Sequence, residues 1–243
     1  MKNIGILTTL DHPLLPFFLD SFNKNGLRNY YVICDSKLKS TKSTNIWNER
    51  TGGKFKELFE NKLTKLEEHL SSEFYFVDNH NSEMAHKLYD DLNIQCLFNA
   101  GTPRKIHKET IDMMTYGVVN IHPGLLPKYR GSCAVEWAIF NSEKVFLTAH
   151  QMNEDYDAGP IIEIHEIRIC HEDSYEVIRN KVFYDTTILA GKILSEIQNN
   201  FQDINLISQK EENSIYWEPI DDESFEEVKL KVNSGNYFKE INR

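Results

Sequence analysis

The 243-residue sequence is 40% hydrophobic and 26% charged, a composition typical of globular proteins that excludes a disordered or collagen-like chain. This length is enough to bury a sizeable core in one domain, with or without an appendage. The formal net charge of −10 disfavours a broad nucleic-acid-binding surface, because such a surface needs clustered Lys and Arg to release phosphate counterions. Apart from a local basic patch, we therefore expect no nucleic-acid partner.

The cysteines and the N-terminal residues indicate the cellular compartment. Four cysteines are scattered along the chain: Cys34, Cys96, Cys133 and Cys170. They form no C-x-x-C pair, so we interpret them as reduced thiols and expect no zinc site. The first apolar run is interrupted early by polar residues and a proline, and no eighteen-residue apolar stretch occurs. These features predict a soluble, cytoplasmic protein with no membrane partner.

Short apolar runs alternate with segments of helical length over the first half of the chain. The runs are rich in β-branched and aromatic residues and cover residues 3–9, 30–36, 74–78, 94–100 and 117–122. The helical segments between them are residues 12–26, 54–73 and 81–93. Leu63, Leu66 and Leu70 recur at helical spacing in the second segment, and Asn81 or Ser82 can cap the third. We predict an α/β, Rossmann-like fold with a mainly parallel sheet flanked by helices.

The pattern changes after residue 145. Residues 145–153 and 159–169 are two strands joined by a polar loop, which predicts a hairpin-like pair added to the sheet. Residues 173–200 predict a long amphipathic helix that covers one face. From residue 201 the chain is polar and acidic, with one short strand, a proline turn and a last helix expected. We divide the chain into a main domain, residues 1–200, and a short C-terminal extension, residues 201–243, that packs on it.

Asn120 and His122 are polar residues on the last strand of the alternating series. Side chains two apart on a strand point the same way, so both lie on one face near the carboxyl end, where open parallel sheets bind ligands. Pro123 and Gly124 then end the strand. One interpretation is a functional site, and the alternative is that both side chains only satisfy the amides of a turn.

A carboxylate in the following loop favours a site. Asp157 lies just before Gly159 and Pro160. An amide can donate to a developing oxyanion, an imidazole can exchange a proton near neutral pH, and a carboxylate can orient that imidazole. Asn120, His122 and Asp157 therefore predict acyl transfer without a covalent enzyme nucleophile.

Residues 120–131 (NIHPGLLPKYRG) and 155–162 (DYDAGPII) together resemble the signature of the folate-dependent formyltransferases. The resemblance is good over residues 74–170 and weaker in the flanks. It implies the formyltransferase fold, a catalytic domain over residues 1–200, Asn120, His122 and Asp157 as the catalytic trio, and 10-formyltetrahydrofolate as co-substrate, with no metal. Gly124 departs from the pattern, since many members carry Ser there, and this affects a local contact rather than the chemistry.

The resemblance also implies where the folate lies. The expected folate-binding residues are Asp155, Tyr156 and the segment Phe98, Asn99, Ala100, Gly101 and Thr102, which resembles the segment whose backbone lines the folate pocket of the family. For residues 98–102 the alternative is a strand that simply ends in a glycine turn.

Among the formyltransferases, the chain is most similar to the sugar N-formyltransferases, which act on nucleotide-linked amino sugars. The glycinamide ribonucleotide enzymes hold a phosphate on a Gly-rich loop after the first strand, but residues 7–17 contain no glycine. Enzymes that formylate initiator tRNA carry a substantial C-terminal domain, whereas we expect only an acidic extension after residue 200 here. Formyltetrahydrofolate hydrolases carry an N-terminal regulatory domain, whereas the series of strands here starts at residue 3. We expect formyl transfer to the amine of a dTDP-linked amino dideoxy sugar, for O-antigen or other surface-glycan biosynthesis.

Contacts with the sugar nucleotide are expected from five residues: His80, Lys128, Tyr129, Arg130 and Trp217. Four of them have a structural alternative, because His80 can cap a helix, the loop cations Lys128 and Arg130 can be solvated, and a tail strand with Trp217 can cover the core. The histidines without metal-ligand spacing are interpreted as structural or surface residues: His86, His150, His165 and His171.

Two other functions stay open. The first is formyl transfer to another small amine, such as a purine precursor, and the second is a folate-binding module without turnover. The expected partners are folate and the nucleotide-linked amino sugar, and a homodimer is left open.

Overall fold

The computed structural model describes residues 2–37, 41–54 and 73–241. Apart from its two end residues, the helix expected over residues 54–73, with Leu63, Leu66 and Leu70, lies outside the described residues.

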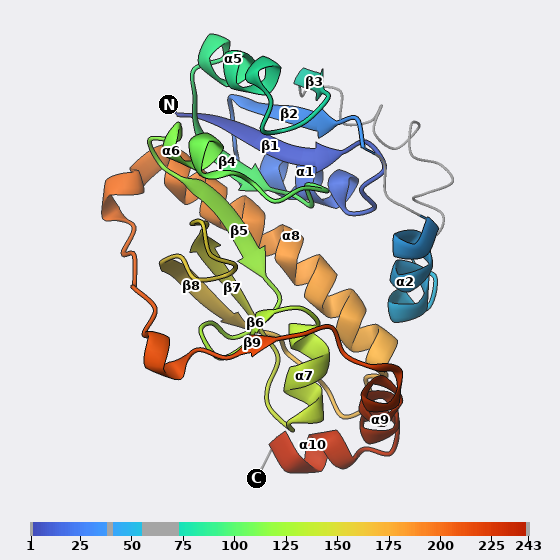
Figure 1. Ribbon diagram of the computed structural model, residues 1–243. Helices are drawn as coiled ribbons and strands as arrows, with labels where there is room; N and C mark the ends of the chain where they lie inside the picture. Colours follow the sequence, from blue (N-terminus) through green and yellow to red (C-terminus); the bar gives the residue numbers. More distant parts are fainter. Residues whose placement is uncertain (1, 38–40, 55–72, 242–243) are drawn as a thin grey trace.

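A seven-stranded sheet forms the centre of the molecule, in the order β3-β2-β1-β4-β5-β7-β8 (Figure 1). Its strands are β1 (Asn3–Thr9), β2 (Tyr30–Asp35), β3 (Glu73–Val77), β4 (Ile94–Asn99), β5 (Val118–His122), β7 (Phe146–Gln151) and β8 (Ile161–Glu166). Strands β1 to β5 are parallel, whereas β7 runs antiparallel to both β5 and β8. The predicted α/β fold and the hairpin-like pair are confirmed.

The α-helices of the described residues are α1 (Leu15–Lys24), α2 (Thr41–Thr51), α5 (Glu83–Asp91), α6 (Lys108–Asp112), α7 (Ala134–Phe140), α8 (Tyr175–Asn200), α9 (Asp222–Asn233) and α10 (Asn236–Ile241). Helices α1 and α8 cover one face of the sheet, and α5 covers the other (Figure 1). Ser82 caps α5, because its hydroxyl accepts a hydrogen bond from the Ala85 amide, as one of the two predicted caps. Helix α8 is the long helix predicted over residues 173–200. Among the described residues, no helix combines the length and apolarity needed to cross a bilayer.

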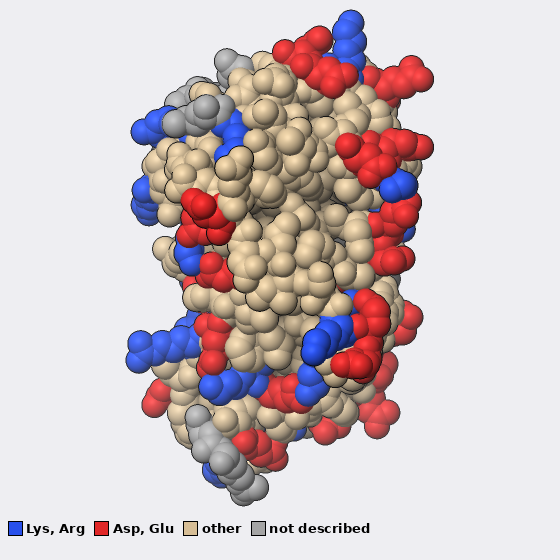
Figure 2. Space-filling model, turned by 90° about the vertical axis from the view of Figure 1, so that its left-hand side faces the viewer, with Lys and Arg blue, Asp and Glu red and all other residues tan. Residues whose placement is uncertain are grey.

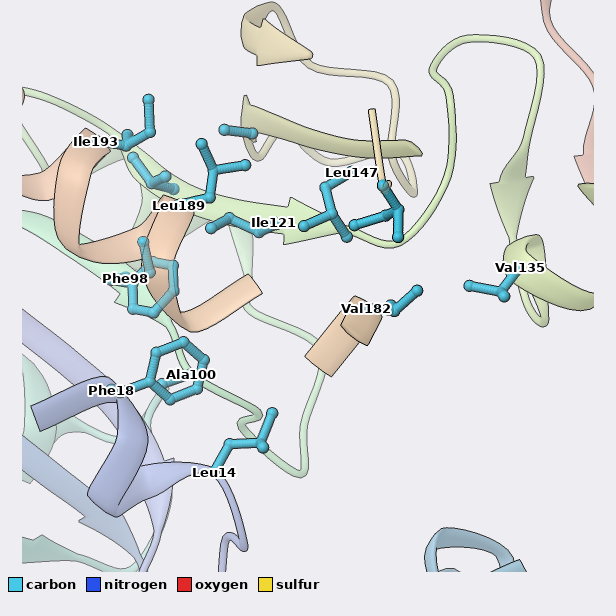
Figure 3. Close-up of a cluster of buried hydrophobic side chains, with 14 of the residues drawn as sticks. Leu14, Phe18, Phe98, Ala100, Ile121, Val135, Leu147, Val182, Leu189 and Ile193 are labelled. Atoms are coloured by element: carbon cyan, nitrogen blue, oxygen red, sulfur yellow. The ribbon is translucent and has the colours of Figure 1, made fainter. Parts of the chain in front are cut away.

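The core explains why the strands are continuously apolar. One cluster lies between the sheet and helices α1 and α8, where Phe18 contacts Phe98 and the side chains of Ile121, Leu147 and Leu189 gather (Figure 3). A second cluster on the other face includes Leu7 and Leu97 with Tyr89 of α5. Alternate residues of one strand therefore enter different clusters, and each fully buried side chain contributes about 1.5–3 kcal/mol.

The C-terminal extension crosses the sheet edge and returns to the main domain (Figure 1). After the short helices η1 (Phe201–Asp203) and η2 (Glu211–Asn213), strand β9 (Tyr216–Trp217) pairs in parallel with β6 (Arg130–Gly131). The short strand and a last helix were predicted, but β6 and α10 were not, because elements of two and six residues show no clear periodicity. The division at residue 200 stays a prediction.

Candidate active site

Polar side chains converge where the carboxyl ends of β4 and β5 meet the β7–β8 loop, residues 152–160. They surround a pocket of about 340 Å³. Its walls are Asn99, residues 102–106, Asn120, His150 and residues 152–157. Two of the predicted trio, Asn120 and Asp157, thus line a cavity large enough for part of a small-molecule ligand.

A directed chain of hydrogen bonds orients the Asn120 amide. The backbone amides of Gly101 and Thr102 donate to Asn99 Oδ1, at 3.1 and 3.0 Å, and Asn99 Nδ2 donates to Asn120 Oδ1 at 3.1 Å. Asn120 Nδ2 in turn donates to His150 Nε2 at 3.1 Å. The Asn120 oxygen is therefore engaged on one side, and one N–H of its amide is left to donate to a ligand.

His150 is neutral in this arrangement. Its Nδ1 donates to the Gln151 carbonyl oxygen at 2.9 Å, which makes Nε2 the acceptor that Asn120 needs. Burial lowers the pKa of His150 from 6.5 to about 4, although the Asp157 carboxylate acts in the opposite direction. His150 therefore serves as a hydrogen-bond acceptor and not as a cation at neutral pH.

His122 and Asp157 lie side by side, with Asp157 in the pocket wall and His122 behind it. His122 Nε2 donates to the Tyr129 carbonyl oxygen at 2.5 Å, and His122 Nδ1 lies 3.4 Å from Asp157 Oδ2. Nε2 is thus engaged by a backbone carbonyl, and Nδ1 faces the carboxylate. The imidazole is almost fully buried, whereas the Asp157 side chain is 16% exposed and lines the pocket. Of these two side chains, Asp157 is therefore the one that reaches the pocket.

A backbone amide and an unusual backbone conformation hold the Asp157 carboxylate in place. Asp157 has a left-handed backbone, with φ of +54°, which is uncommon for a residue with a side chain. Its Oδ2 accepts a hydrogen bond from the Gly131 amide at 3.0 Å. Gly131 is itself left-handed, with φ of +90°, and a Cβ there would lie 2.4 Å from the Trp217 carbonyl oxygen. Glycine at this position lets the amide, Asp157 and β9 approach one another.

Gly124, the departure from the formyltransferase pattern, has no room for a side chain. A Cβ at this position would lie 2.8 Å from His122 Nε2 and 2.7 Å from the Ala134 Cβ. In this chain the Ala134 methyl group occupies the space beside Gly124, just after the end of β5.

The residues expected to bind folate separate into two groups. Asn99, Thr102, Asp155 and Tyr156 line the pocket. Phe98 and Ala100 point into the core, where Phe98 contacts Phe18 and Phe22, and Gly101 packs against the His12 ring. The expectation for residues 98–102 concerns their backbone, so the burial of the Phe98 and Ala100 side chains leaves it a prediction.

The structure places the five residues expected to contact the sugar nucleotide away from the pocket surface. His80 is fully buried, with its ring nitrogens on Thr102 Oγ1 and the Ile33 carbonyl, and burial lowers its pKa. Lys128 pairs with Glu143, and Tyr129 is buried. Trp217 stacks on Tyr129 and donates to the Lys128 carbonyl oxygen.

Arg130 is also committed within the protein. It is 7% exposed, and its guanidinium donates to Gln209 and Glu211 of the extension. The stacking of Trp217 supports its structural alternative, whereas Arg130 is a buried, paired cation and not the solvated loop cation of the alternative. Tyr216, the neighbour of Trp217, is the more accessible ring at 54% exposed, and it lies above Gly131.

Two site residues were missed or misinterpreted from the sequence. His150 was taken as a structural or surface residue, yet it pairs with Asn120 across β5 and β7. Thr148 and His150 repeat on β7 the two-residue spacing of Asn120 and His122, and that repetition was an available signal. Arg104, which lines the pocket, was not considered; its guanidinium binds the buried Asp35 carboxylate at 2.6 and 3.1 Å.

Within residues 2–37, 41–54 and 73–241, no group of three or more His, Cys, Asp or Glu side chains is arranged to hold a metal ion. The site combines an amide, two imidazoles and a carboxylate beside a pocket. Groups of these kinds take part in acid–base catalysis and in stabilising an oxyanion.

The family comparison agrees with this chemistry. The Formyl transferase family matches residues 19–189, which include the pocket and the Asn120, His122 and Asp157 constellation. The chain belongs to this family. Members of the family use 10-formyltetrahydrofolate as the formyl donor.

Individual relatives fall into more than one class. Methionyl-tRNA formyltransferase of Ehrlichia ruminantium (strain Gardel) is 35% identical over 118 residues, which is 48% of this chain and 38% of that protein. A sugar N-formyltransferase from Shewanella sp FDAARGOS_354 has the same fold, with a TM-score of 0.64 and 18% identity over 96% of this chain and 88% of that one.

An N-formyltransferase from Helicobacter canadensis, solved with folinic acid and dTDP-3-aminofucose, has a TM-score of 0.58 at 18% identity and covers 89% of this chain and 71% of that one. Phosphoribosylglycinamide formyltransferases also share the fold. The chain thus matches less than half the length of its curated relative, and the structural likenesses establish the fold.

Proposed function

We propose that this chain transfers a formyl group from 10-formyltetrahydrofolate to the amino group of a nucleotide-linked, dTDP-type amino sugar. The observation that carries the chemistry is the oriented Asn120 amide beside the His122 and Asp157 pair at the wall of a pocket. Folate contacts are assigned to the pocket residues Asn99, Thr102, Asp155 and Tyr156.

In the proposed reaction, the acceptor amine attacks the formyl carbon and the bond from that carbon to N10 of the folate then breaks. The free N–H of Asn120 donates to the formyl oxygen as negative charge develops on it. Asp157, supported by His122, takes a proton from the attacking amine, directly or through a water, and a proton is returned to N10. Holding both substrates in one crevice supplies much of the acceleration. The products are a formamide and tetrahydrofolate.

The choice of a sugar acceptor rests on this chain's own residues. The loop between β1 and α1 contains no glycine, so it lacks the phosphate-binding type of turn used for glycinamide ribonucleotide. The net charge is −10, and Figure 2 shows Lys and Arg scattered among Asp and Glu on the face it presents, around a central area without charged side chains. Binding of a polyanion such as tRNA is favoured by a continuous basic surface, which this face does not have.

Formylation of methionyl-tRNA is the second candidate function. It is favoured by the 35% identity with the Ehrlichia enzyme over 118 residues. Both candidates use the same donor and the same catalytic residues, so they differ only in the acceptor.

A panel of acceptors tests the proposal. The protein is incubated with 10-formyltetrahydrofolate and, separately, dTDP-linked 3-amino and 4-amino sugars, glycinamide ribonucleotide and methionyl-tRNA, and products are identified by mass. We expect a mass gain of one formyl group on an amino-sugar nucleotide. Comparable formylation of glycinamide ribonucleotide or methionyl-tRNA would overturn the sugar assignment and leave formyl transfer standing. Folate binding without product from any acceptor would favour a binding module.

A further inference from the structure

The C-terminal extension is hydrogen-bonded to both loops that carry the site. We name residues 204–217 the crossing segment. On one side Ile207 exchanges backbone hydrogen bonds with Ile161, at 2.8 and 2.9 Å, where the β7–β8 loop ends. On the other side the Arg130 amide donates to the Ile215 carbonyl oxygen at 3.0 Å. The crossing segment therefore joins the Asp157 loop to the loop that follows β5.

One side chain of the crossing segment connects these two loops directly. Gln209 Nε2 donates to the carbonyl oxygens of Asp157 and Gly159, at 2.8 and 2.7 Å. Gln209 Oε1 accepts from Arg130 Nη2 and Nε, at 2.9 and 3.1 Å. Both N–H groups of this one amide thus donate to the β7–β8 loop, and its oxygen accepts from Arg130 in the loop that follows β5.

These contacts fix the catalytic carboxylate from two directions. By binding the carbonyl groups of Asp157 and Gly159, Gln209 holds the backbone on both sides of the Asp157 side chain, where Asp157 has a left-handed conformation. Arg130 immediately precedes Gly131, whose amide donates to Asp157 Oδ2. A shift of either loop would move the carboxylate from its place 3.4 Å from His122 Nδ1.

We propose that Gln209 is a positioning residue, which holds the β7–β8 loop so that the Asp157 carboxylate faces His122. This inference rests on the proposed function, because it assigns Gln209 a part in formyl transfer at that same site. It also makes the C-terminal extension a component of the active site. Positioning matters in catalysis because a displacement of about 1 Å can lower a rate by about a hundredfold.

Three variants separate positioning from general stability. Gln209→Met keeps much of the volume and removes all four contacts. Gln209→Glu keeps an acceptor for Arg130 and removes only the donors to the loop carbonyls. Glu211→Ala is the matched control, because Glu211 binds Arg130 but makes no contact with Asp157 or Gly159, and its side chain is 72% exposed.

Two measurements are made on each full-length variant, well below its melting temperature. The first is the steady-state rate with the acceptor found in the panel. The second is amide hydrogen exchange at Gly131, which reports the hydrogen bond to Asp157 without requiring activity. For both Gln209 variants we expect kcat to fall about tenfold to a hundredfold and exchange at Gly131 to accelerate. Glu211→Ala is expected to match the wild type in both.

The outcomes distinguish the two proposals. If Gln209→Met and Gln209→Glu lower only the melting temperature and leave kcat unchanged, Gln209 is a structural residue and the positioning role is wrong. If the wild type formylates no acceptor, the proposed function fails, and Gly131 exchange alone decides whether Gln209 holds the loop.

Discussion

Asn120 Nδ2 donates a hydrogen bond to His150 Nε2, at 3.1 Å, across the antiparallel pair β5 and β7. This contact decides which way the Asn120 amide faces, because His150 Nδ1 is occupied by a backbone carbonyl and only Nε2 can accept. The orientation of the amide is what allows it to donate to an oxyanion.

The first prediction removes that acceptor. His150→Phe removes the acceptor of the half-buried Asn120 Nδ2 and leaves the amide held only through Oδ1, so we expect kcat to fall about tenfold to a hundredfold, from a donor left without its partner at a cost of about 1–3 kcal/mol. His150→Gln, whose amide oxygen can accept, should retain most of the activity. Steady-state kinetics of both variants, with binding of a folate analogue as a check of the pocket, test this. Wild-type kcat in His150→Phe would show that His150 does not orient Asn120.

The second prediction concerns stability and pH. Burial lowers the pKa of His150 to about 4, whereas the unfolded chain takes up this proton near 6.5. Between these values the unfolded state binds more protons, so the stability linked to His150 is complete above about pH 6.5 and is lost as the pH falls toward 4. At about 1.4 kcal/mol for each unit, the loss approaches about 3 kcal/mol.

Urea unfolding between pH 7.5 and pH 4.5 measures this dependence. His150→Gln has no group that titrates in this range, so its free energy of unfolding should decline less steeply than that of the wild type. Identical slopes for the two proteins would contradict a neutral, buried His150.

The third prediction concerns the carboxylate. Asp157→Asn keeps the shape of the side chain, and its amide oxygen can still accept from Gly131, but the negative charge beside His122 is removed. We expect kcat to fall by a factor of about 10²–10⁴ while the affinity for a folate analogue changes little. Glu163→Gln, on β8 and paired with Lys192 outside the pocket, is the control for loss of one charge. Near-normal turnover in Asp157→Asn would remove Asp157 from the mechanism.

The fourth prediction concerns a buried charge cluster beneath α7. Glu136 is fully buried, lies 3.6 Å from both Arg50 Nε and Arg179 Nε, and accepts from the Tyr175 hydroxyl at 2.6 Å. Burial alone would raise the pKa of Glu136, but the two guanidinium groups outweigh it and hold the pKa below its ordinary value.

Glu136→Gln leaves the buried Arg179 and the partly buried Arg50 without this counter-charge, at a cost of about 3–5 kcal/mol. Glu166→Gln, which breaks the half-exposed pair with Lys144, should change stability by less than about 1 kcal/mol. Equal unfolding midpoints in urea for the two variants would show that the Glu136 cluster contributes no more than a surface pair.

Local sequence determined the strands of the main sheet, the helices α1, α5 and α8, and the face on which the first two site residues lie. Continuous apolar runs specify strands buried on both faces, Ser82 specifies the start of α5, and the spacing of Asn120 and His122 places both on one side of β5. Asp157 was predicted to join them because it follows the next strand in the order that the formyltransferase signature requires.

Only the tertiary structure decided which partners these residues have. The pairing of Asn120 with His150 depends on the register between β5 and β7, and the contacts of Gln209 with Asp157 and Arg130 join positions 52 and 79 residues apart. His80 and Trp217 were expected to contact the sugar nucleotide, yet packing from distant segments buries His80 and occupies the polar atoms of both. Periodicity reports the conformation of a segment and the direction of its side chains, whereas register and burial are set by whichever segments the folded chain brings against it.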